Sequence, residues 1–297
     1  MKEFIKYIFK IIIIAFVIMY VFDEVYSYTF QNGTPRNKIQ KILQLNNHHY
    51  DYAFLGSSRT ENHIDCELIE KLTGKSCINF GISGGTIGDM LILMTIAESK
   101  GITFNEVFLQ VDYSYNGSGI SNNFRASLVP YINDKVVKHQ LIKNGENVFY
   151  NYIPFYRYLK YDKVVGFREF FSVLFNKKPK TDLNVGFAPK IGQGLAVSGK
   201  LPDKFKAENE ELTALFRLME KRNTKLTCFT APYCKNIENR AVMRTLKSRI
   251  PDLKDYISIF DDNPEFFFNC GHLNIEGARA FTEIITEDLI QPTKINL

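Results

Sequence analysis

The stretch Tyr50-Asp-Tyr-Ala-Phe-Leu-Gly-Ser-Ser-Arg59 decides the fold that the sequence predicts. Its apolar run ends abruptly in Gly-Ser-Ser, and a polar segment compatible with a helix follows from Glu61 to Leu72. This pattern predicts a strand, a sharp turn at Gly56 and the start of a helix. In an open α/β sheet, such a turn lies at the carboxyl end of a strand, where ligands bind. Ser58 is then expected near a helix N-terminus, where backbone N–H groups face developing negative charge.

A serine in this position acts as a nucleophile only where a base reaches it. The best candidate for that base is His272, in the stretch Asn269-Cys-Gly-His272 before a predicted helix from Ile275 to Leu289. Taken singly, Gly-Ser-Ser is a common loop, and a histidine before a helix is often only a cap. Together they favour a site, because a serine after the first strand and a histidine before the last helix can meet at one sheet edge.

These two segments resemble the first and last sequence blocks of the SGNH (GDSL-type) hydrolase superfamily. The resemblance is closest to the membrane-anchored branch that serves acylation of the bacterial cell envelope. That branch includes the D-alanyl transfer protein of teichoic-acid operons and the alginate O-acetylation proteins. The resemblance covers residues 50 to 115 and 224 to 290. It implies Ser58 as the nucleophile and His272 as the base, in a reaction that needs no cofactor.

The sequence departs from the family at one position. The family histidine closes an Asp-x-x-His motif, whereas this chain has Asn269 in place of the aspartate. An asparagine fixes the tautomer of His272 in only one orientation of its amide, and it supplies no charge to the imidazolium; in a serine protease this change costs about 10⁴-fold in turnover. Three outcomes stay open. Asp261 or Asp262 reaches His272 instead, a Ser–His dyad oriented by a backbone carbonyl suffices, or the pocket only binds its ligand.

Two further turns supply candidates for the oxyanion hole. The glycine-rich stretch from Gly81 to Gly88 resembles the second block of the family, which implies that the N–H groups of Ser58 and Gly84 hold the oxyanion. Glycine also suits a place where the backbone must approach a reacting carbonyl closely, although a plain strand-to-helix turn has the same composition. The third block places an asparagine after the next strand, where the candidates in this chain are Ser114 and Asn116.

Arg59, directly after the serine, has two interpretations. Its guanidinium either binds an anionic group of the substrate or pairs with a carboxylate that fixes the turn. No spacing in the sequence suggests a metal site. The five cysteines are too few and too scattered for a disulfide scaffold, so buried thiols are favoured, with Cys234 and Cys270 as the first choice for a pair.

The N-terminus predicts a membrane anchor. Lys2, Lys6 and Lys10 precede an uninterrupted apolar run from Ile11 to Phe22, and the segment counted from Ile5 is just long enough to span a bilayer. The lysines place this end in the cytoplasm and the remainder of the chain outside it, at the cell membrane. A cleavable signal peptide is the alternative, but no Ala-x-Ala site follows, so an uncleaved single-pass anchor is favoured.

Strands and helices alternate on both sides of an interruption, which predicts an α/β fold with a mostly parallel sheet. With the resemblance, the expectation is a three-layer α/β/α, flavodoxin-like SGNH fold with five strands, at 51–55, 77–80, 106–111, 225–230 and 256–260. The chain then divides into a cytoplasmic tip and anchor at 1–24, a polar stalk at 25–49 and an SGNH-like domain at 50–297.

The interruption at residues 117–206 is basic and aromatic. It holds 15 Lys or Arg against 6 Asp or Glu, so it carries +9 while the rest of the chain carries −4. We predict an inserted helical lid, with contact to anionic lipid head groups or an acidic glycan as an addition. A nucleic-acid partner does not fit a domain outside the cytoplasm. The aromatic residues are Phe149, Tyr150, Tyr152, Phe155, Tyr156, Tyr158, Tyr161, Phe167, Phe170, Phe171 and Phe175.

The resemblance implies a serine-dependent esterase or O-acyltransferase acting on acyl esters of cell-envelope polysaccharide, with acetyl expected as the acyl group. The partner is then a cell-envelope glycan or an acylated sugar, and the acceptor is water or a sugar hydroxyl. The alternative is a catalytically impaired binding subunit of a polysaccharide acylation complex, with a polytopic membrane acyltransferase as its partner.

Overall fold

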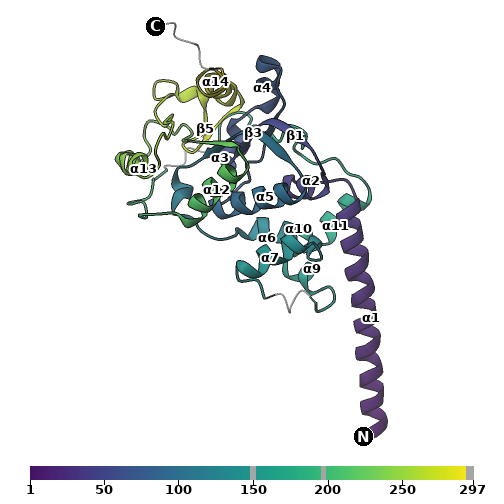
Figure 1. The fold of residues 1–297 in the computed structure, drawn as a ribbon. Coiled ribbons are helices and arrows are strands. Elements are labelled where there is room, and N and C mark those ends of the chain that lie inside the picture. Colours follow the sequence, from purple (N-terminus) through teal and green to yellow (C-terminus); the bar gives the residue numbers. More distant parts are fainter. Residues whose placement is uncertain (148–151, 195–198, 292–297) are drawn as a thin grey trace. The chain divides into compact units, whose positions relative to one another are not determined.

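The computed structural model describes residues 1–147, 152–194 and 199–291 (Figure 1). The chain divides into two compact units, Met1–Gln44 with Asn122–Pro179 (unit 1) and Leu45–Ser121 with Lys180–Leu297 (unit 2). The predicted insertion is therefore shared, since its residues 122–179 belong to unit 1 and 180–206 to unit 2. Of its aromatic residues, Phe149 and Tyr150 lie outside the described ranges.

Unit 2 is an α/β fold on a four-stranded parallel sheet in the order β2-β1-β3-β4. In the central strand, Ala53 pairs with Ile78 on one side and Val107 on the other. The ends of the two central strands are buried without a break, as parallel sheets covered on both faces require. The strands are β1 (His49–Leu55), β2 (Cys77–Asn79), β3 (Thr103–Gln110) and β4 (Lys225–Phe229).

Helices lie on both sides of this sheet (Figure 1). On one side, Phe54 and Phe108 of the central strands join a core cluster with Ile69 of α4 and Phe281 of α14. On the other side, α5 and α12 pack against each other. The helices and small strands of unit 2 are α3 (Ser58–His63), α4 (Cys66–Thr73), α5 (Ile87–Ser99), η1 (Tyr113–Asn116), α12 (Glu210–Lys221), η3 (Arg240–Val242), α13 (Met243–Arg249), η4 (Pro264–Phe266), β5 (Phe267–Asn269), β6 (His272–Leu273), α14 (Ile275–Ile285) and η5 (Thr286–Ile290).

The fifth strand predicted at residues 256–260 does not form, and residues 257–260 are turns. A single parallel bridge, from Phe229 to Lys254, remains beside β4. Asp255 accounts for the break, because its carboxylate accepts hydrogen bonds from Thr230 Oγ1 at 2.9 Å and from the Ile257 N–H at 3.2 Å. A side chain that bonds to nearby backbone competes with strand pairing. An irregular segment therefore follows β4 where a strand was expected.

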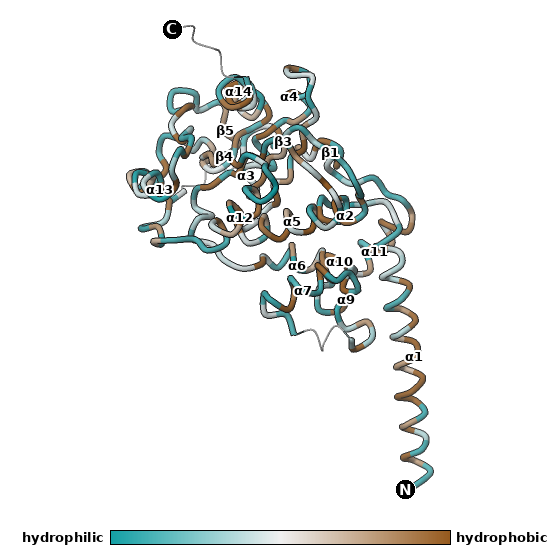
Figure 2. Tube along the Cα trace, in the orientation of Figure 1, coloured by the Kyte–Doolittle hydropathy of each residue, from teal (hydrophilic) through white to brown (hydrophobic). Residues whose placement is uncertain are grey.

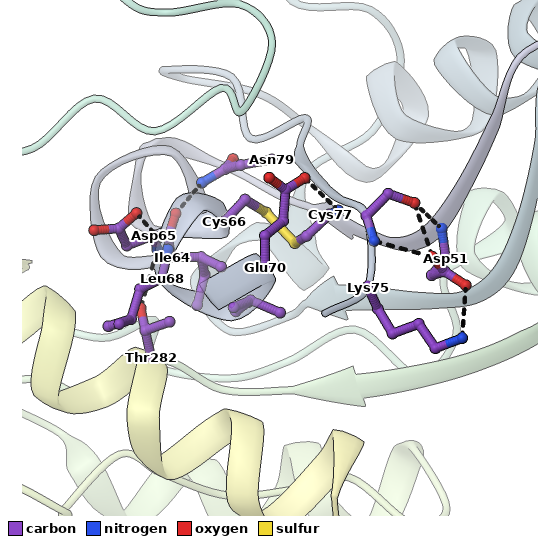
Figure 3. The surroundings of a disulfide bond; sticks show 12 residues. Asp51, Ile64, Asp65, Cys66, Leu68, Glu70, Lys75, Cys77, Asn79 and Thr282 are labelled. Carbon is purple, nitrogen blue, oxygen red and sulfur yellow. Dashed lines mark hydrogen bonds and ion pairs between the residues drawn. A yellow bond between two sulfur atoms is a disulfide. The ribbon is translucent and has the colours of Figure 1, made fainter. Parts of the chain in front are cut away.

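Two disulfides cross-link segments of unit 2. Cys66–Cys77 joins α4 to β2, beside Glu70, whose carboxylate accepts from the Cys77 N–H at 3.0 Å (Figure 3). Cys234–Cys270, the pair given first choice from the sequence, joins the loop after β4 to the antiparallel hairpin β5–β6. Most cysteines are thus paired rather than free, and Cys228 is a buried thiol.

Unit 1 begins with α1 (Lys2–Asn32), a helix long and apolar enough to cross a membrane. Residues 25–32, expected as part of a stalk, continue this helix. Ser27 Oγ donates to the Asp23 carbonyl at 2.7 Å and Thr29 Oγ1 to the Val25 carbonyl at 2.8 Å. Because the helix itself satisfies these hydroxyls, polar residues remain within it.

The C-terminal third of α1 is part of the core of unit 1. Tyr26 and Phe30 are buried in a cluster with Tyr158, Val165 and Phe170, among others, and the Tyr26 and Phe170 rings stack with centroids 4.0 Å apart. Helix α1 and residues 122–179 of the insertion therefore fold as one body. Besides α1, unit 1 contains α2 (Lys38–Gln44), α6 (Asn122–Leu128), η2 (Val129–Tyr131), α7 (Lys135–Lys143), α9 (Tyr156–Lys160), α10 (Asp162–Val165) and α11 (Phe167–Leu174).

Candidate active site

The turn after β1 presents Ser58 as the first residue of α3. Gly56 adopts φ +149°, and a Cβ there would lie 2.3 Å from Thr60 Oγ1 and 2.9 Å from Gln110, so the turn requires glycine. Ser57 is the N-cap of α3, and its hydroxyl donates to Gln110 Oε1 at 2.8 Å. Each residue of Gly-Ser-Ser thus has a separate role, and Ser58 alone is left to face the surface of unit 2.

The structure brings Ser58, His272 and Asn269 together. Ser58 Oγ lies 2.9 Å from His272 Nε2, and His272 Nδ1 lies 3.1 Å from Asn269 Oδ1. The hairpin β5–β6 pairs Asn269 with His272 directly. The hairpin therefore sets the geometry between the histidine and the residue behind it, and the sheet edge supplies the serine.

The backbone N–H of Gly271 fixes the orientation of the Asn269 amide. This N–H donates to Asn269 Oδ1 at 3.0 Å. Since a backbone N–H only donates, the amide atom facing it must be the oxygen, and the same oxygen faces His272 Nδ1. His272 then carries its proton on Nδ1, which leaves Nε2 to accept the Ser58 hydroxyl. The asparagine thus adopts the one orientation that fixes the tautomer needed for a base.

The surroundings of His272 favour its neutral form. Burial, then the positive charges of Arg59 and Lys190, lower its pKa to about 4. Neither of the two aspartates considered as replacements contacts the histidine, because Asp261 pairs with Arg240 and Asp262 with Lys235. A proton placed on His272 during a reaction therefore gains little electrostatic support, which is the consequence of Asn269.

Arg59 lies beneath the site and is 2% exposed. Its Nε donates to Asp112 Oδ2 at 2.7 Å, its Nη1 to the Gly271 carbonyl, and its Nη2 to the carbonyls of Ala231 and Pro232 at 2.6 and 2.9 Å. These acceptors lie after β3, in the hairpin β5–β6 that carries His272 (the histidine hairpin), and after β4. Of its two interpretations, the contacts observed are those of a residue that pairs with a carboxylate and fixes the turn.

His63 is a residue that the sequence analysis missed. It is fully buried, its Nε2 accepts the Leu273 N–H at 3.0 Å, and its ring meets that of His272 edge to face at 6.0 Å. Burial, followed by the charge of Arg59, lowers the pKa of His63 well below its usual value, so it remains an acceptor. It holds the backbone next to His272. The only sequence signal for His63 was its position within α3, which places it on the buried face of that helix.

The glycine-rich turn from Gly81 to Gly88 packs against the turn from Gly56 to Ser58. The Ile82 N–H donates to the Gly56 carbonyl at 3.0 Å, and a Cβ on Gly81 would lie 2.3 Å from the Glu61 nitrogen. Gly84 stands at φ +71°, with open space where its Cβ would be. The glycine-rich turn therefore lies against the start of α3, and the role of Gly84 as an oxyanion donor stays a prediction.

The two oxyanion-hole candidates after β3, Ser114 and Asn116, have other surroundings. Asn116 donates to the Lys204 carbonyl at 2.7 Å and accepts from the Lys206 N–H at 2.9 Å, so its amide is occupied by backbone. Ser114 is buried. Tyr113, which precedes both, lines the same cleft as Ser58 and His272. Burial, then the charge of Asp112, raises the pKa of Tyr113, so the phenol stays a donor at neutral pH.

A cleft of about 440 Å³ opens over Ser58 and His272. Tyr113, Tyr233, Lys200 and Ile237 line it, together with backbone from the histidine hairpin. Its mixed lining of aromatic, aliphatic and cationic groups is typical of a small-molecule pocket. Among the described residues, no group of three or more His, Cys, Asp or Glu side chains is arranged to hold a metal ion.

Comparison with known proteins adds no assignment. No protein-family model matches the chain, and no curated protein matches it. Among solved structures it is similar to one described as "a putative platelet activating factor from Streptococcus pneumonia", with 12% sequence identity, a TM-score of 0.38, and 95% of this chain and 98% of that chain covered. At this level of similarity the neighbour carries no argument about the site, which is interpreted from its own contacts.

Proposed function

We propose that this chain is a membrane-anchored, SGNH-like serine esterase or O-acyltransferase acting on acyl esters, acetyl esters in particular, of cell-envelope polysaccharide. The contact of 2.9 Å between Ser58 Oγ and His272 Nε2, with Asn269 on the other ring nitrogen, carries the proposal. Two observations support a cell-envelope glycan as the substrate. One is the sequence resemblance, and the other is a helix long enough to span a membrane.

The proposed reaction is acyl transfer through a serine ester. As Ser58 Oγ bonds to the carbonyl carbon, His272 Nε2 takes the hydroxyl proton. Collapse of the tetrahedral intermediate breaks the ester C–O bond, and His272 returns the proton to the leaving alcohol. Water or a sugar hydroxyl then gives its proton to His272 and attacks the acyl carbon. The bond between that carbon and Ser58 Oγ breaks, and His272 returns the proton to Ser58. Water as acceptor makes the protein an esterase, and a sugar hydroxyl makes it a transferase.

Three donors are proposed for the oxyanion. The Ser58 N–H is at the first position of α3 and has no acceptor within the described residues. The Gly84 N–H belongs to the open turn beside it. The Tyr113 hydroxyl, in the same cleft as Ser58, is proposed to take the place of the asparagine of the family's third block. Donors that are in place before charge develops stabilise the transition state most effectively.

The contacts of α1 support retention of the anchor. Asp23 is buried and accepts from Arg157 and from the Phe155 N–H, and Tyr26 lies in the core of unit 1. Signal cleavage near Val25-Tyr26-Ser27 would remove Asp23 and leave the buried Arg157 without its carboxylate. Leaving one partner of a buried ion pair uncompensated costs about 3–5 kcal/mol. We therefore propose an uncleaved, single-pass anchor with the remaining residues outside the cytoplasm.

Hydrolysis of p-nitrophenyl acetate by the full chain in detergent tests the serine chemistry. We expect turnover by the native chain, loss of turnover in Ser58→Ala, and higher turnover in Asn269→Asp. Ser83→Ala is the matched control, because Ser83 is an exposed serine in the neighbouring glycine-rich turn, bonded to Glu61. Turnover equal to the buffer blank in every variant would exclude esterase activity toward this substrate.

The second candidate is a binding subunit of a membrane-bound polysaccharide acylation complex, and Asn269 is the observation that favours it. Labelling with a fluorophosphonate separates the two. A label on Ser58 that is lost in Ser58→Ala and kept in Ser83→Ala supports the enzyme. Binding of acetylated glycan without any label supports the binding subunit.

A further inference from the structure

The anchor helix changes character at Phe22. The large apolar side chains from Phe4 to Phe22 are all exposed or nearly so, and this part of α1 is the brown stretch of Figure 2. The segment from Ile5 to Phe22 is about 27 Å long at ~1.5 Å per residue, close to the ~30 Å of a bilayer's hydrocarbon core. Asp23 is the first buried residue of the helix. The outer limit of a membrane therefore falls at Phe22 and Asp23.

The insertion contacts α1 at this limit. The Phe155 ring lies 5.7 Å from the Phe22 ring, and the Phe155 N–H donates to Asp23 Oδ2 at 2.8 Å. Arg157 donates to Asp23 and, at 2.7 Å, to Ser27 Oγ. Because these bonds are buried, they fix residues 155–158, and with them α9, at the height where α1 leaves the membrane.

Helix α11 extends from the same height outward. Phe170 stacks on Tyr26, and Val173 lies against Gly33, so α11 and α1 run in the same direction. Phe167, one turn before Phe170, is therefore level with Phe22. Leu174, seven residues after Phe167 in α11, is farther out by about 10 Å at ~1.5 Å per residue.

The surface at the height of Phe22 is apolar, aromatic and basic. Leu159 is 60% exposed and Phe167 64% exposed, so this surface presents two large apolar side chains outward. Lys163 and Arg168 are exposed beside them. Residues 122–179 hold ten Lys or Arg against four Asp or Glu. Aromatic rings with neighbouring cations are the composition of segments that lie at the head groups of a membrane.

We propose that residues 155–168 form a lipid-contact surface that lies in the head-group region of the bilayer leaflet from which α1 emerges, with a preference for anionic lipids. The inference rests on the proposed anchoring by α1, and it is independent of the serine chemistry. A lipid occupant is favoured because α1 fixes this surface at the height of the head groups, where its exposed cations meet their phosphates. A second membrane protein on the same surface is the competing occupant.

The absence of tryptophan from the chain makes the test direct. The full chain is reconstituted into nanodiscs with Leu159→Trp or Phe167→Trp, and fluorescence is compared between plain lipid and lipid brominated near the head-group end of the acyl chains. Leu174→Trp is the matched control, since it is an exposed apolar residue of the same helix as Phe167 but lies farther out. Ile13→Trp, in the middle of the apolar segment, reports whether α1 spans the bilayer.

We expect the brominated lipid to reduce fluorescence at positions 159 and 167 and not at 174, with a larger loss in discs of phosphatidylglycerol than of phosphatidylcholine. The double variant Lys163→Glu, Arg168→Glu should remove that difference. No loss at 159 and 167 while Ile13→Trp is quenched by deeply brominated lipid would overturn the proposal and leave the surface to a protein partner. Equal loss of fluorescence in discs of the two lipids would overturn the preference for anionic lipid. If Ile13→Trp is not quenched either, the proposed anchoring fails.

Discussion

Arg59 Nε donates to Asp112 Oδ2 at 2.7 Å between two side chains that are 2% and 0% exposed. The same guanidinium donates to carbonyls after β4 and in the histidine hairpin, and it lies over the Tyr233 ring at 3.5 Å from the centroid. One cation thus joins the turn that carries Ser58 to three other segments at the carboxyl edge of the sheet. Removing it would disturb several loops at once.

We expect Arg59→Met to lower the free energy of unfolding by about 3–5 kcal/mol, because it leaves Asp112 buried without a partner. Lys71→Ala, which breaks the exposed pair between Lys71 and Glu67, is the control and should cost at most ~1 kcal/mol. Urea unfolding of the two variants measures the difference. If Arg59→Met folds as stably as the control but loses activity through a raised KM, the substrate-binding interpretation of Arg59 is the correct one.

The pH profile of hydrolysis should follow His272. Its pKa is lowered to about 4, so the ring is neutral and able to accept a proton at any pH well above 4. We expect kcat/KM to rise with pH through about 4 and to stay level from pH 5.5 to 7.5, where a histidine with an ordinary pKa of about 6.5 would still be titrating. A midpoint near 6.5 would contradict the described environment of His272.

Asn269→Asp should move that midpoint upward. A carboxylate at 3.1 Å from Nδ1 stabilises the imidazolium, so the pKa of His272 rises and the acidic limb shifts toward neutral pH. Turnover on the plateau should increase, with ~10⁴-fold as the upper bound set by the converse change in a serine protease. Asn274→Asp, at the N-cap of α14, adds the same charge five residues away and should leave the midpoint almost unchanged.

Tyr113→Phe tests the proposed oxyanion donor. Loss of one donor typically lowers kcat by about 10²-fold, with KM little changed because the donor acts mainly in the transition state. Tyr115→Phe is the matched control, since Tyr115 belongs to the same short helix and is buried away from the cleft lining. Equal kinetics in the two variants would remove Tyr113 from the proposed machinery.

The sequence predicted the parts of the fold that local chemistry decides. The helical segment expected to end at Leu72 ends at Thr73, where Gly74 takes a left-handed φ of 68°. The four strands from β1 to β4 lie within a few residues of their predicted positions. Buried, β-branched and aromatic runs between glycine turns carry this information without any knowledge of tertiary contacts.

The remaining features depend on contacts between distant residues. The segment at 256–260 has the composition of a strand, but the bond from Thr230 to Asp255 draws it into turns. Tyr113 was passed over because a tyrosine after a buried strand usually joins the core. The orientation of Asn269 depends on the Gly271 N–H within a hairpin whose strands are too short to show a period of two. Such features become visible only in three dimensions.

His63 provides a last test, because it holds the histidine hairpin through a single hydrogen bond to the Leu273 N–H. His63→Leu leaves that buried N–H without an acceptor, which should cost about 1–3 kcal/mol of stability and lower kcat. His63→Gln keeps an acceptor and should restore much of the kcat, an effect that a purely structural role would not produce. If both variants lose kcat equally, the bond to Leu273 does not position His272.

The pH dependence of stability gives an independent measure of His63. Its folded pKa lies well below the unfolded value of about 6.5, so the unfolded chain binds the proton more tightly. The contribution of neutral His63 to the free energy of unfolding is therefore complete above pH 6.5, and it is lost as the pH falls from there toward the folded pKa. His272 titrates in the same direction, so the comparison belongs in a His272→Gln background. In that background, His63→Gln should flatten the decline in stability between pH 6.5 and 4.5, and an unchanged decline would show that His63 is not held in its neutral form.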